Sequence, residues 1–293
     1  MDNASSQVMF KNRVFLFLQG PHGPFFNQLA KMLTKADATV WRIGFNQGDA
    51  FFWRNKSQFI PFNQPIETWS DFFQHTLSDK NITDIVLYGD TRDIHAKAIE
   101  IAKSRGVKVH VFEEGYLRPY WFTYERSGAN GHSKLMTMSV PDMQKALHNS
   151  DLEMPLPPAH WGDTRQHIFY GALYHWHVMF RNGKFPNFKP HRALTVAQEF
   201  KLYVKRLSLM PLHSAQRALA TRRIHQGGFP YHLVLLQLEH DASFQMHSPF
   251  SSMVEFLELC VENFASGAPG HHHLVFKAHP LEDGRAPISK TLA

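Results

Sequence analysis

Three short segments of this chain carry residues suited to transfer chemistry, and each follows an apolar run typical of a strand. They span residues 19–23, 113–115 and 277–280, which read Gln-Gly-Pro-His-Gly, Glu-Glu-Gly and Lys-Ala-His-Pro. In open α/β sheets, ligands bind beyond the carboxyl ends of the strands. A pair of acids and a Lys/His pair at such positions suggest group transfer from a phosphate-activated substrate. The spacing alone does not identify the donor.

The adjacent carboxylates Glu113 and Glu114 are the stronger signal. Like charges this close repel each other, which raises the pKa of one of them, and this suits a general base or a nucleophile. Arg118 follows closely enough to restore the charge balance. The alternative is a surface loop with ordinary acids. We favour the functional interpretation because the pair follows a predicted strand at the expected ligand-binding edge.

Lys277 and His279 can stabilise a phosphate leaving group without a metal ion. Pro280 biases His279 towards an extended backbone. Three consecutive histidines at residues 271–273 come just before, but they cannot all face one ion from a regular strand. A surface loop is the simpler interpretation. Because the other histidines also lack zinc-site spacing, we predict no metal site.

Two further turns follow predicted strands. The turn with Gly20 and Gly23 lets the backbone approach an anion closely, at the N-terminus of the next helix, but taken alone it is better explained as a plain tight turn. Asp90, Arg92 and His95 follow another strand. Arg92 or His95 can bind a carboxylate or phosphate. Alternatively, Asp90 caps a helix and Arg92 is a solvated surface residue.

Strands alternate with helices along most of the chain. The predicted strands span residues 14–18, 38–43, 84–88, 107–112, 231–237 and 273–277. The predicted helices span residues 25–33, 68–77 and 94–105, and one more begins at Ser248-Pro249. This alternation predicts parallel, Rossmann-like sheets. We expect an α/β fold with an N-terminal domain over 8–158, a helical basic connector over 159–229 and a partial second domain over 230–293.

Composition excludes several classes of protein. Hydrophobic residues make up 43% of the 293 residues, which is too many for a disordered chain. The apolar runs hold about five residues, whereas a membrane span needs roughly 20. The N-terminus lacks the basic-then-apolar pattern of a secretory signal. The single cysteine, Cys260, lies in an apolar helical context, which predicts a buried thiol and fits a reducing cytoplasm.

Basic residues are concentrated in one segment. Ten cations and one anion lie between Arg181 and Arg223, so this segment carries +9 and the rest of the chain −3 of the net charge of +6. Aromatic residues are interleaved with the cations. This mixture suits a membrane interface, a single-stranded nucleic acid, or a solvated face over a helical core. No nucleic-acid-binding signature accompanies it, so we predict no nucleic acid partner.

The segments described so far belong to a longer series of motifs. The series covers residues 18–21, 23–26, 42–49, 88–92, 112–119, 128–131, 236–237, 247–250 and 276–280. Together, and in this order, these motifs resemble the KpsS/LipB group of capsule polysaccharide biosynthesis proteins. They span nearly the whole chain, which makes the resemblance far more specific than any single motif.

This resemblance implies a GT-B glycosyltransferase of two Rossmann-like domains. It implies transfer of β-linked Kdo from CMP-Kdo, without a cofactor, to a lyso-phosphatidylglycerol terminus. It also implies a peripheral position on the cytoplasmic face of the inner membrane, beside other capsule biosynthesis and export proteins. Because donor and product are both β-linked, configuration is retained, and retention usually requires a carboxylate nucleophile. Asp90, Glu113 and Glu114 are the candidates, with the Glu pair ranked first.

The resemblance also implies binding roles. By analogy with CMP-sialic-acid transferases, His279 with Lys277 meets the CMP phosphate, and one of the paired glutamates serves as acid/base. Arg92 or Arg118 can hold the carboxylate of Kdo by a two-pronged contact. The other residues implied in substrate binding are Gln19, Gly20, Gly23, His95, Asn130, Gln237 and Ser248.

Members of this group continue well past the His-Pro strand, whereas this sequence ends 13 residues after Pro280. We therefore expect either a truncated chain or an incomplete donor site. The alternative function is a non-catalytic component of capsule assembly or export with the same fold. The enzymatic interpretation requires that the acid pair and the Lys/His pair face each other across a shared cleft.

Overall fold

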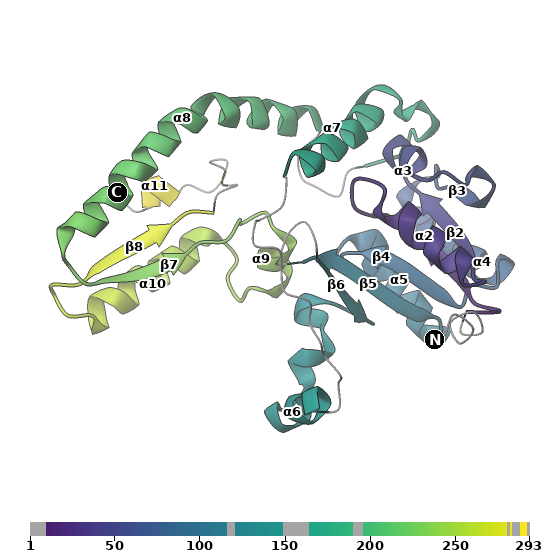
Figure 1. Ribbon diagram of the computed structural model, residues 1–293, viewed down its shortest axis with the longest axis horizontal. Coiled ribbons are helices and arrows are strands. Elements are labelled where there is room, and N and C mark those ends of the chain that lie inside the picture. Colours follow the sequence, from purple (N-terminus) through teal and green to yellow (C-terminus); the bar gives the residue numbers. More distant parts are fainter. Residues whose placement is uncertain are drawn as a thin grey trace, which may run out of the picture. The chain divides into compact units, whose positions relative to one another are not determined.

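A computed structural model describes residues 10–115, 121–148, 164–189, 196–279, 282 and 288–291. The chain divides into two compact units, Met1–Ala193 and Leu194–Ala293. Each unit has its own sheet, as Figure 1 shows. The mixed α/β architecture with parallel strands confirms the predicted Rossmann-like fold class.

The first unit is built on a six-stranded sheet in the order β3-β2-β1-β4-β5-β6. The strands are β1 (Val14–Phe17), β2 (Thr39–Gly44), β3 (Phe59–Pro61), β4 (Asp84–Tyr88), β5 (Lys108–Glu114) and β6 (Phe122–Arg126). All neighbours pair in parallel except β6, which pairs antiparallel to β5. The strand order therefore reverses between β1 and β4, the position at which open α/β sheets bind their ligands.

Alternating side chains of the strands build a hydrophobic core on each face of this sheet. Leu16 and Leu18 point into one core, which α4 (Trp69–Asp79) and α5 (Asp93–Ser104) cover. Phe15 and Phe17 point into the other, which α2 (Phe25–Lys35) and the segment after α3 (Gln47–Phe52) cover. Strands buried on both faces are mostly apolar, which is why the sequence shows them as short apolar runs.

Local signals explain where several elements begin and end. α5 ends at Ser104, and Gly106 follows with φ +69°, as expected of a left-handed helix stop. Asn46 caps α3 by accepting a hydrogen bond from the Asp49 N–H. The short 3-10 helices of this unit are η1 (Lys56–Gln58), η2 (Ile66–Thr68), η3 (Asn130–His132), η4 (Lys134–Thr137) and η5 (Asn182–Lys184).

The second unit is smaller and contains a two-stranded parallel sheet. Its elements are α8 (Val196–Gly227), β7 (Tyr231–Leu235), α9 (Ala242–His247), α10 (Met253–Gly267), β8 (His273–Lys277) and α11 (Ile288–Thr291). The core of the unit consists of Leu236, Phe244, Met253 and Leu257. It is one β-α-β unit with a long preceding helix.

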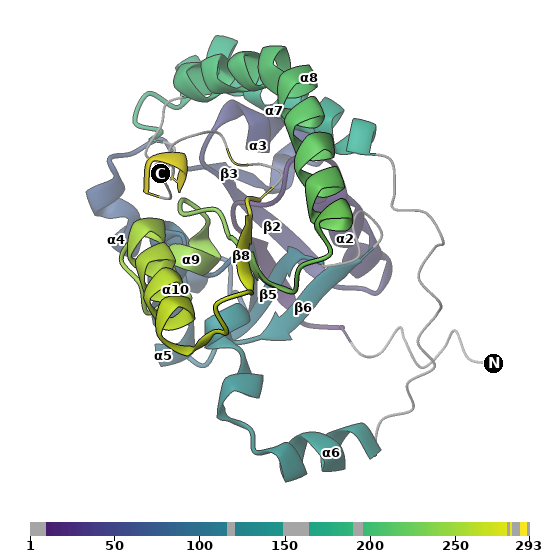
Figure 2. The same cartoon turned by 90° about the vertical axis from the view of Figure 1, so that its left-hand side faces the viewer.

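Four elements differ from the sequence-based expectation. α6 (Val140–His148) forms where a loop was expected and projects from the first unit with an exposed surface (Figure 2). α7 (Thr164–Phe180), expected in the connector, packs against α3. β5 continues through Glu114 because β6 pairs with it there. α10 begins at Met253 because Ser252, rather than Ser248, accepts the capping hydrogen bond from the Glu255 N–H.

No helix within the described part of the chain is both long enough and apolar enough to span a membrane. Cys260 is only partly buried, whereas the sequence predicted a buried thiol. Cys260 lies on the same face of α10 as the buried Met253 and Leu257, but in the C-terminal half of the helix, where no residue is buried.

Candidate functional site

The site is built at the carboxyl ends of β1 and β4, on either side of the strand-order switch. Gln19 follows β1 and Arg92 follows β4. The Arg92 Nη1 donates a hydrogen bond of 2.8 Å to the Gln19 Oε1. This contact joins two segments that are 73 residues apart in the sequence. The structure thus brings together two residues that were predicted separately from their motifs.

A buried tyrosine from α7 extends this contact into a network. The Tyr174 hydroxyl accepts hydrogen bonds from the Asn46 Nδ2 at 2.7 Å and from the Gln19 Nε2 at 3.3 Å. It donates to the Asp49 Oδ1 at 3.4 Å. Burial raises the pKa of Tyr174, and the nearby Asp49 carboxylate raises it further, so the phenol stays protonated and can serve as a donor.

Asp49 is the acidic centre of the network. Its Oδ1 accepts a hydrogen bond of 2.9 Å from Arg42, and its Oδ2 accepts one of 3.0 Å from the Phe45 N–H. Burial raises the pKa of Asp49, and the Arg42 guanidinium opposes that effect. A Cβ at Gly48 would lie 2.5 Å from the Tyr174 ring, so only glycine lets α7 approach this closely.

The glycine turn after β1 packs against the same helix. Gly23 has φ +114°, a conformation that favours glycine. The His22 ring stacks on the Tyr174 ring with centroids 4.3 Å apart and an angle of 26°. A Cβ at Gly20 would lie 2.5 Å from the Phe26 ring. The turn predicted from residues 19–23 is therefore tightly packed, and its shape depends on both glycines.

Asp90 lies just after β4 and is buried. Its Oδ2 accepts hydrogen bonds from the Ala129 N–H at 2.9 Å and from the His132 Nδ1 at 3.1 Å. The neighbouring His95, also buried, donates from its Nδ1 to the Gly89 carbonyl at 2.6 Å. The loop after β6 thus holds Asp90. His95 fixes the backbone of the turn at Gly89, which directly precedes Asp90.

The two paired glutamates lie on opposite faces of the sheet, because both belong to β5 and side chains alternate along a strand. Glu113 shares the face of Val109 and Val111. Its Oε1 lies 3.5 Å from where a Cβ on Gly89 would stand, which places this carboxylate beside the turn that carries Asp90. Glu114 lies on the other face. Because the two carboxylates point to opposite faces, they repel each other less than their adjacency in the sequence suggested.

The remaining predicted residues are spread over both units. Asn130 has φ +52° in η3. Lys277 is the last residue of β8, and His279 follows it. Gln237 is exposed after β7, and the Ser248 Oγ accepts a hydrogen bond from the Phe250 N–H at 3.1 Å.

Arg118 lies outside the described residues. The acid pair belongs to the first unit and the Lys/His pair to the second, and their meeting at one donor site stays a prediction. Among the described residues, no cluster of His, Cys, Asp or Glu is arranged to hold a metal ion.

Comparison with known proteins adds a second kind of observation. Residues 83–291, more than half of the chain, match the family described as "Capsule polysaccharide biosynthesis protein". The chain belongs to this family. The match begins at β4 and includes the Asp90 turn, the acid pair and the Lys/His pair.

Two kinds of curated relatives of this capsule family resemble the chain. The capsule polysaccharide export protein KpsS of Escherichia coli is 28% identical over 302 aligned residues, which cover 100% of this chain and 75% of that protein. The capsule polysaccharide modification protein LipB of Neisseria meningitidis serogroup A is 31% identical over 277 residues, covering 92% of this chain and 65% of that protein. LipB of serogroup B gives the same values.

Sequence reasoning missed several members of the site in this capsule protein. They are Arg42, Asn46, Asp49, His132 and Tyr174. The first three lie in a segment noted only for its resemblance, although Asn46 followed by Asp49 at the third helical position is a capping signal. Tyr174 carried no local signal, because its partners are 125 to 155 residues away in the sequence.

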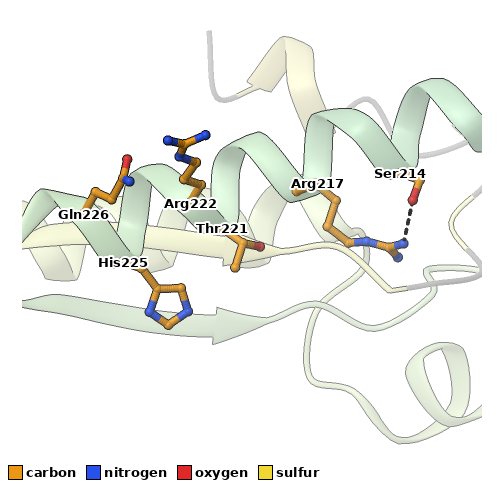
Figure 3. Close-up of a pocket in the computed structure, with 7 residues that line it drawn as sticks. Ser214, Arg217, Thr221, Arg222, His225 and Gln226 are labelled. Atoms are coloured by element: carbon orange, nitrogen blue, oxygen red, sulfur yellow. Dashed lines mark hydrogen bonds between the residues drawn. The ribbon is translucent and has the colours of Figure 1, made fainter.

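The basic region forms an exposed surface on α8. A cavity of ≈620 Å³ is lined only by residues of this helix, among them Arg217, Arg222 and His225. In Figure 3, Arg222 and Gln226 point to one side of the helix, whereas Thr221 and His225 point to the other. The Arg217 Nη2 lies 3.4 Å from the Ser214 Oγ. No acid lines the cavity, so it favours anions.

Proposed function

We propose that this capsule polysaccharide biosynthesis protein is a retaining glycosyltransferase that moves β-Kdo from CMP-Kdo to a lyso-phosphatidylglycerol acceptor. The observation that carries the proposal is the Arg92–Gln19 hydrogen bond of 2.8 Å across the strand-order switch. Asp90 directly follows Gly89, and the Glu113 Oε1 lies 3.5 Å from where a Cβ on Gly89 would stand. An arginine and carboxylates at this edge match the needs of an anionic sugar donor.

Arg92 is the residue proposed to bind the carboxylate of Kdo. A guanidinium offers five N–H donors in a fixed plane and pairs with a carboxylate by two parallel hydrogen bonds. Gln19 fixes the orientation of that plane before the ligand arrives. A preorganised contact loses less entropy on binding, so this pair favours a planar anion over a neutral sugar.

The leaving group and nucleophile are assigned to the two units. Lys277 and His279 are proposed to stabilise the CMP phosphate as it leaves, without a cofactor or metal ion. A carboxylate of the first unit is proposed to form the covalent sugar adduct that retention requires. Glu113 is the first candidate, because it lies next to Gly89 beside the strand-order switch.

The acceptor and the membrane surface are assigned to α8. Arg217, Arg222 and Arg223 are exposed on this helix, and exposed cations are attracted to anionic headgroups by about 1 kcal/mol each. This supports a peripheral position on an anionic membrane surface. We propose that this surface is the cytoplasmic face of the inner membrane and that other capsule biosynthesis and export proteins act beside it.

A second candidate function is a non-catalytic component of capsule assembly or export. It is favoured by the name of the Escherichia coli relative, which is an export protein. Under this alternative, the network around Tyr174 is purely structural and the basic helix is a protein contact.

The deciding experiment is incubation of the full-length protein with CMP-Kdo and a fluorescent lyso-phosphatidylglycerol. We expect a slower-migrating product that carries one Kdo, and a Kdo adduct on the protein detectable by mass spectrometry. If CMP-Kdo binds but yields neither product nor adduct, the protein is a scaffold. Full turnover in each of the E113Q, E114Q and D90N variants would contradict the assignment of the nucleophile.

A further inference from the structure

The contact between Asp90 and His132 has a defined chemical direction. An ionised carboxylate only accepts hydrogen bonds, so the His132 Nδ1, 3.1 Å from the Asp90 Oδ2, carries the hydrogen. The Ala129 N–H donates to the same oxygen at 2.9 Å. In neutral His132, the Nε2 is therefore the basic nitrogen.

Exposure differs sharply between the two side chains. The Asp90 side chain is 1% exposed, whereas that of His132 is 54% exposed. A buried carboxylate that accepts from one ring nitrogen fixes the tautomer and the orientation of a reachable imidazole. This is the arrangement that a general base requires.

The loop that delivers His132 has an unusual backbone. β6 runs antiparallel to β5, and the Ser127 N–H then bonds to the Val109 carbonyl near the start of β5. Ser127 and Asn130 have φ of +75° and +52°, values that are uncommon for residues other than glycine. Together they turn the chain back towards Asp90. Strained positions of this kind cluster at functional sites.

Glycine at position 128 is also required by this loop. A Cβ there would lie 2.5 Å from the His132 carbonyl oxygen. The loop therefore combines two strained residues, one obligatory glycine and a buried partner for its histidine.

We propose that His132 is the general base for the acceptor hydroxyl and that Asp90 is the positioning residue that holds it. This inference rests on the proposed function. In the second half of a retaining transfer, the acceptor O–H bond breaks and its proton goes to the His132 Nε2. The freed oxygen bonds to the anomeric carbon. The bond from that carbon to the enzyme carboxylate breaks, and its electron pair returns to the carboxylate. Asp90 then leaves the list of nucleophiles, and the Glu pair remains.

The test compares the H132A and H132Q variants with H75Q, which changes an exposed histidine on α4. CMP release and Kdo transfer are measured separately. For H132A, we expect CMP to be released in a burst of one equivalent per enzyme, while transfer slows by about 100-fold or more. Added imidazole should restore part of the transfer rate. H75Q should match the wild type in both assays.

The D90N variant tests the positioning role. An amide oxygen can still accept from Ala129 and His132, but the negative charge is gone. We expect slower transfer, a normal CMP burst and no rescue by imidazole. If D90N does not fold, H132A and H132Q still carry the test, because the His132 side chain is exposed.

Three outcomes would overturn the proposal. The first is transfer by H132A within twofold of the wild type. The second is that H132A loses the CMP burst and Kdo transfer to the same extent and that imidazole restores neither, which would mean a structural role. The third is a wild-type protein that neither releases CMP nor transfers Kdo, in which case the proposed function fails and the general-base role with it. In the first two cases, only the role of His132 fails.

Discussion

The Tyr174 hydroxyl lies 2.7 Å from the Asn46 Nδ2, although 128 residues separate them in the sequence. The contact fastens α7 to the turn between β2 and α3. Through Gln19, two successive hydrogen bonds link the same hydroxyl to Arg92. The orientation of the proposed ligand-binding arginine therefore depends on a helix that the sequence places far from it.

Replacing Tyr174 by phenylalanine should loosen this network. The ring packing is kept, but three buried polar groups lose a partner, so the Y174F variant should lose about 1–3 kcal/mol of its free energy of unfolding. Chemical denaturation measures this loss. Y170F is the matched control, because Tyr170 lies one helical turn earlier and its hydroxyl makes no hydrogen bond among the described residues. Equal stability of the two variants would contradict the role given to the Tyr174 hydroxyl.

Asp84 at the start of β4 should control stability at acidic pH. Burial favours the neutral acid, but hydrogen bonds from His110, Arg13 and Thr83 outweigh it and hold the pKa of Asp84 well below its usual value. Because the folded-state pKa is depressed, this stabilisation is complete above the unfolded pKa of about 3.9 and is lost as the pH falls further. We expect the free energy of unfolding to drop between about pH 5 and pH 2.

The D84N variant should show a flatter pH dependence in that range. At pH 7 it should be less stable by about 3 kcal/mol, because Arg13 keeps its charge without its partner. The matched control is D71N, an exposed residue of α4, which should change stability by less than about 0.5 kcal/mol. If D84N shows the same pH dependence as the wild type, other carboxylates cause the loss of stability at acidic pH.

Local patterns were sufficient to predict most of the first unit. Apolar runs identified β1, β2, β4 and β5 because strands buried on both faces are mostly apolar; the buried polar residues Arg42, Asp84 and His110 are exceptions that find polar partners. β6 was missed because its aromatic residues Phe122 and Tyr124 are exposed, whereas the polar Thr123 and Glu125 take the half-buried positions. α3 was missed because six residues are too few for a helical period.

The candidate site was predictable only where its residues follow strands. Gln19, Asp90 and Arg92 follow the carboxyl ends of strands, where open α/β sheets bind their ligands. Tyr174 and His132 come from a helix and a loop that approach the site through tertiary packing. No pattern within a few residues of either one indicates its partner.

Changing Arg92 to lysine should weaken donor use specifically. Lysine keeps the charge but loses the planar fork and the hydrogen bond to Gln19. We expect kcat/KM for CMP-Kdo to fall by about tenfold or more, mainly through KM. R105K is the control, because Arg105 lies at the other end of α5 and bonds only to exposed side chains. A loss in kcat alone would place Arg92 at the reacting centre rather than at the sugar carboxylate.

Reversing charges on α8 should reduce binding to anionic membranes. In R217E/R222E, two exposed attractive charges become repulsive, and each cation lost costs about 1 kcal/mol. Co-sedimentation with phosphatidylglycerol vesicles should therefore fall at least tenfold, and the remaining binding should depend less on salt. K31E/K35E makes the same change of net charge on the exposed face of α2 and should bind nearly as the wild type does. If both double variants lose binding equally, overall charge rather than α8 holds the protein at the membrane.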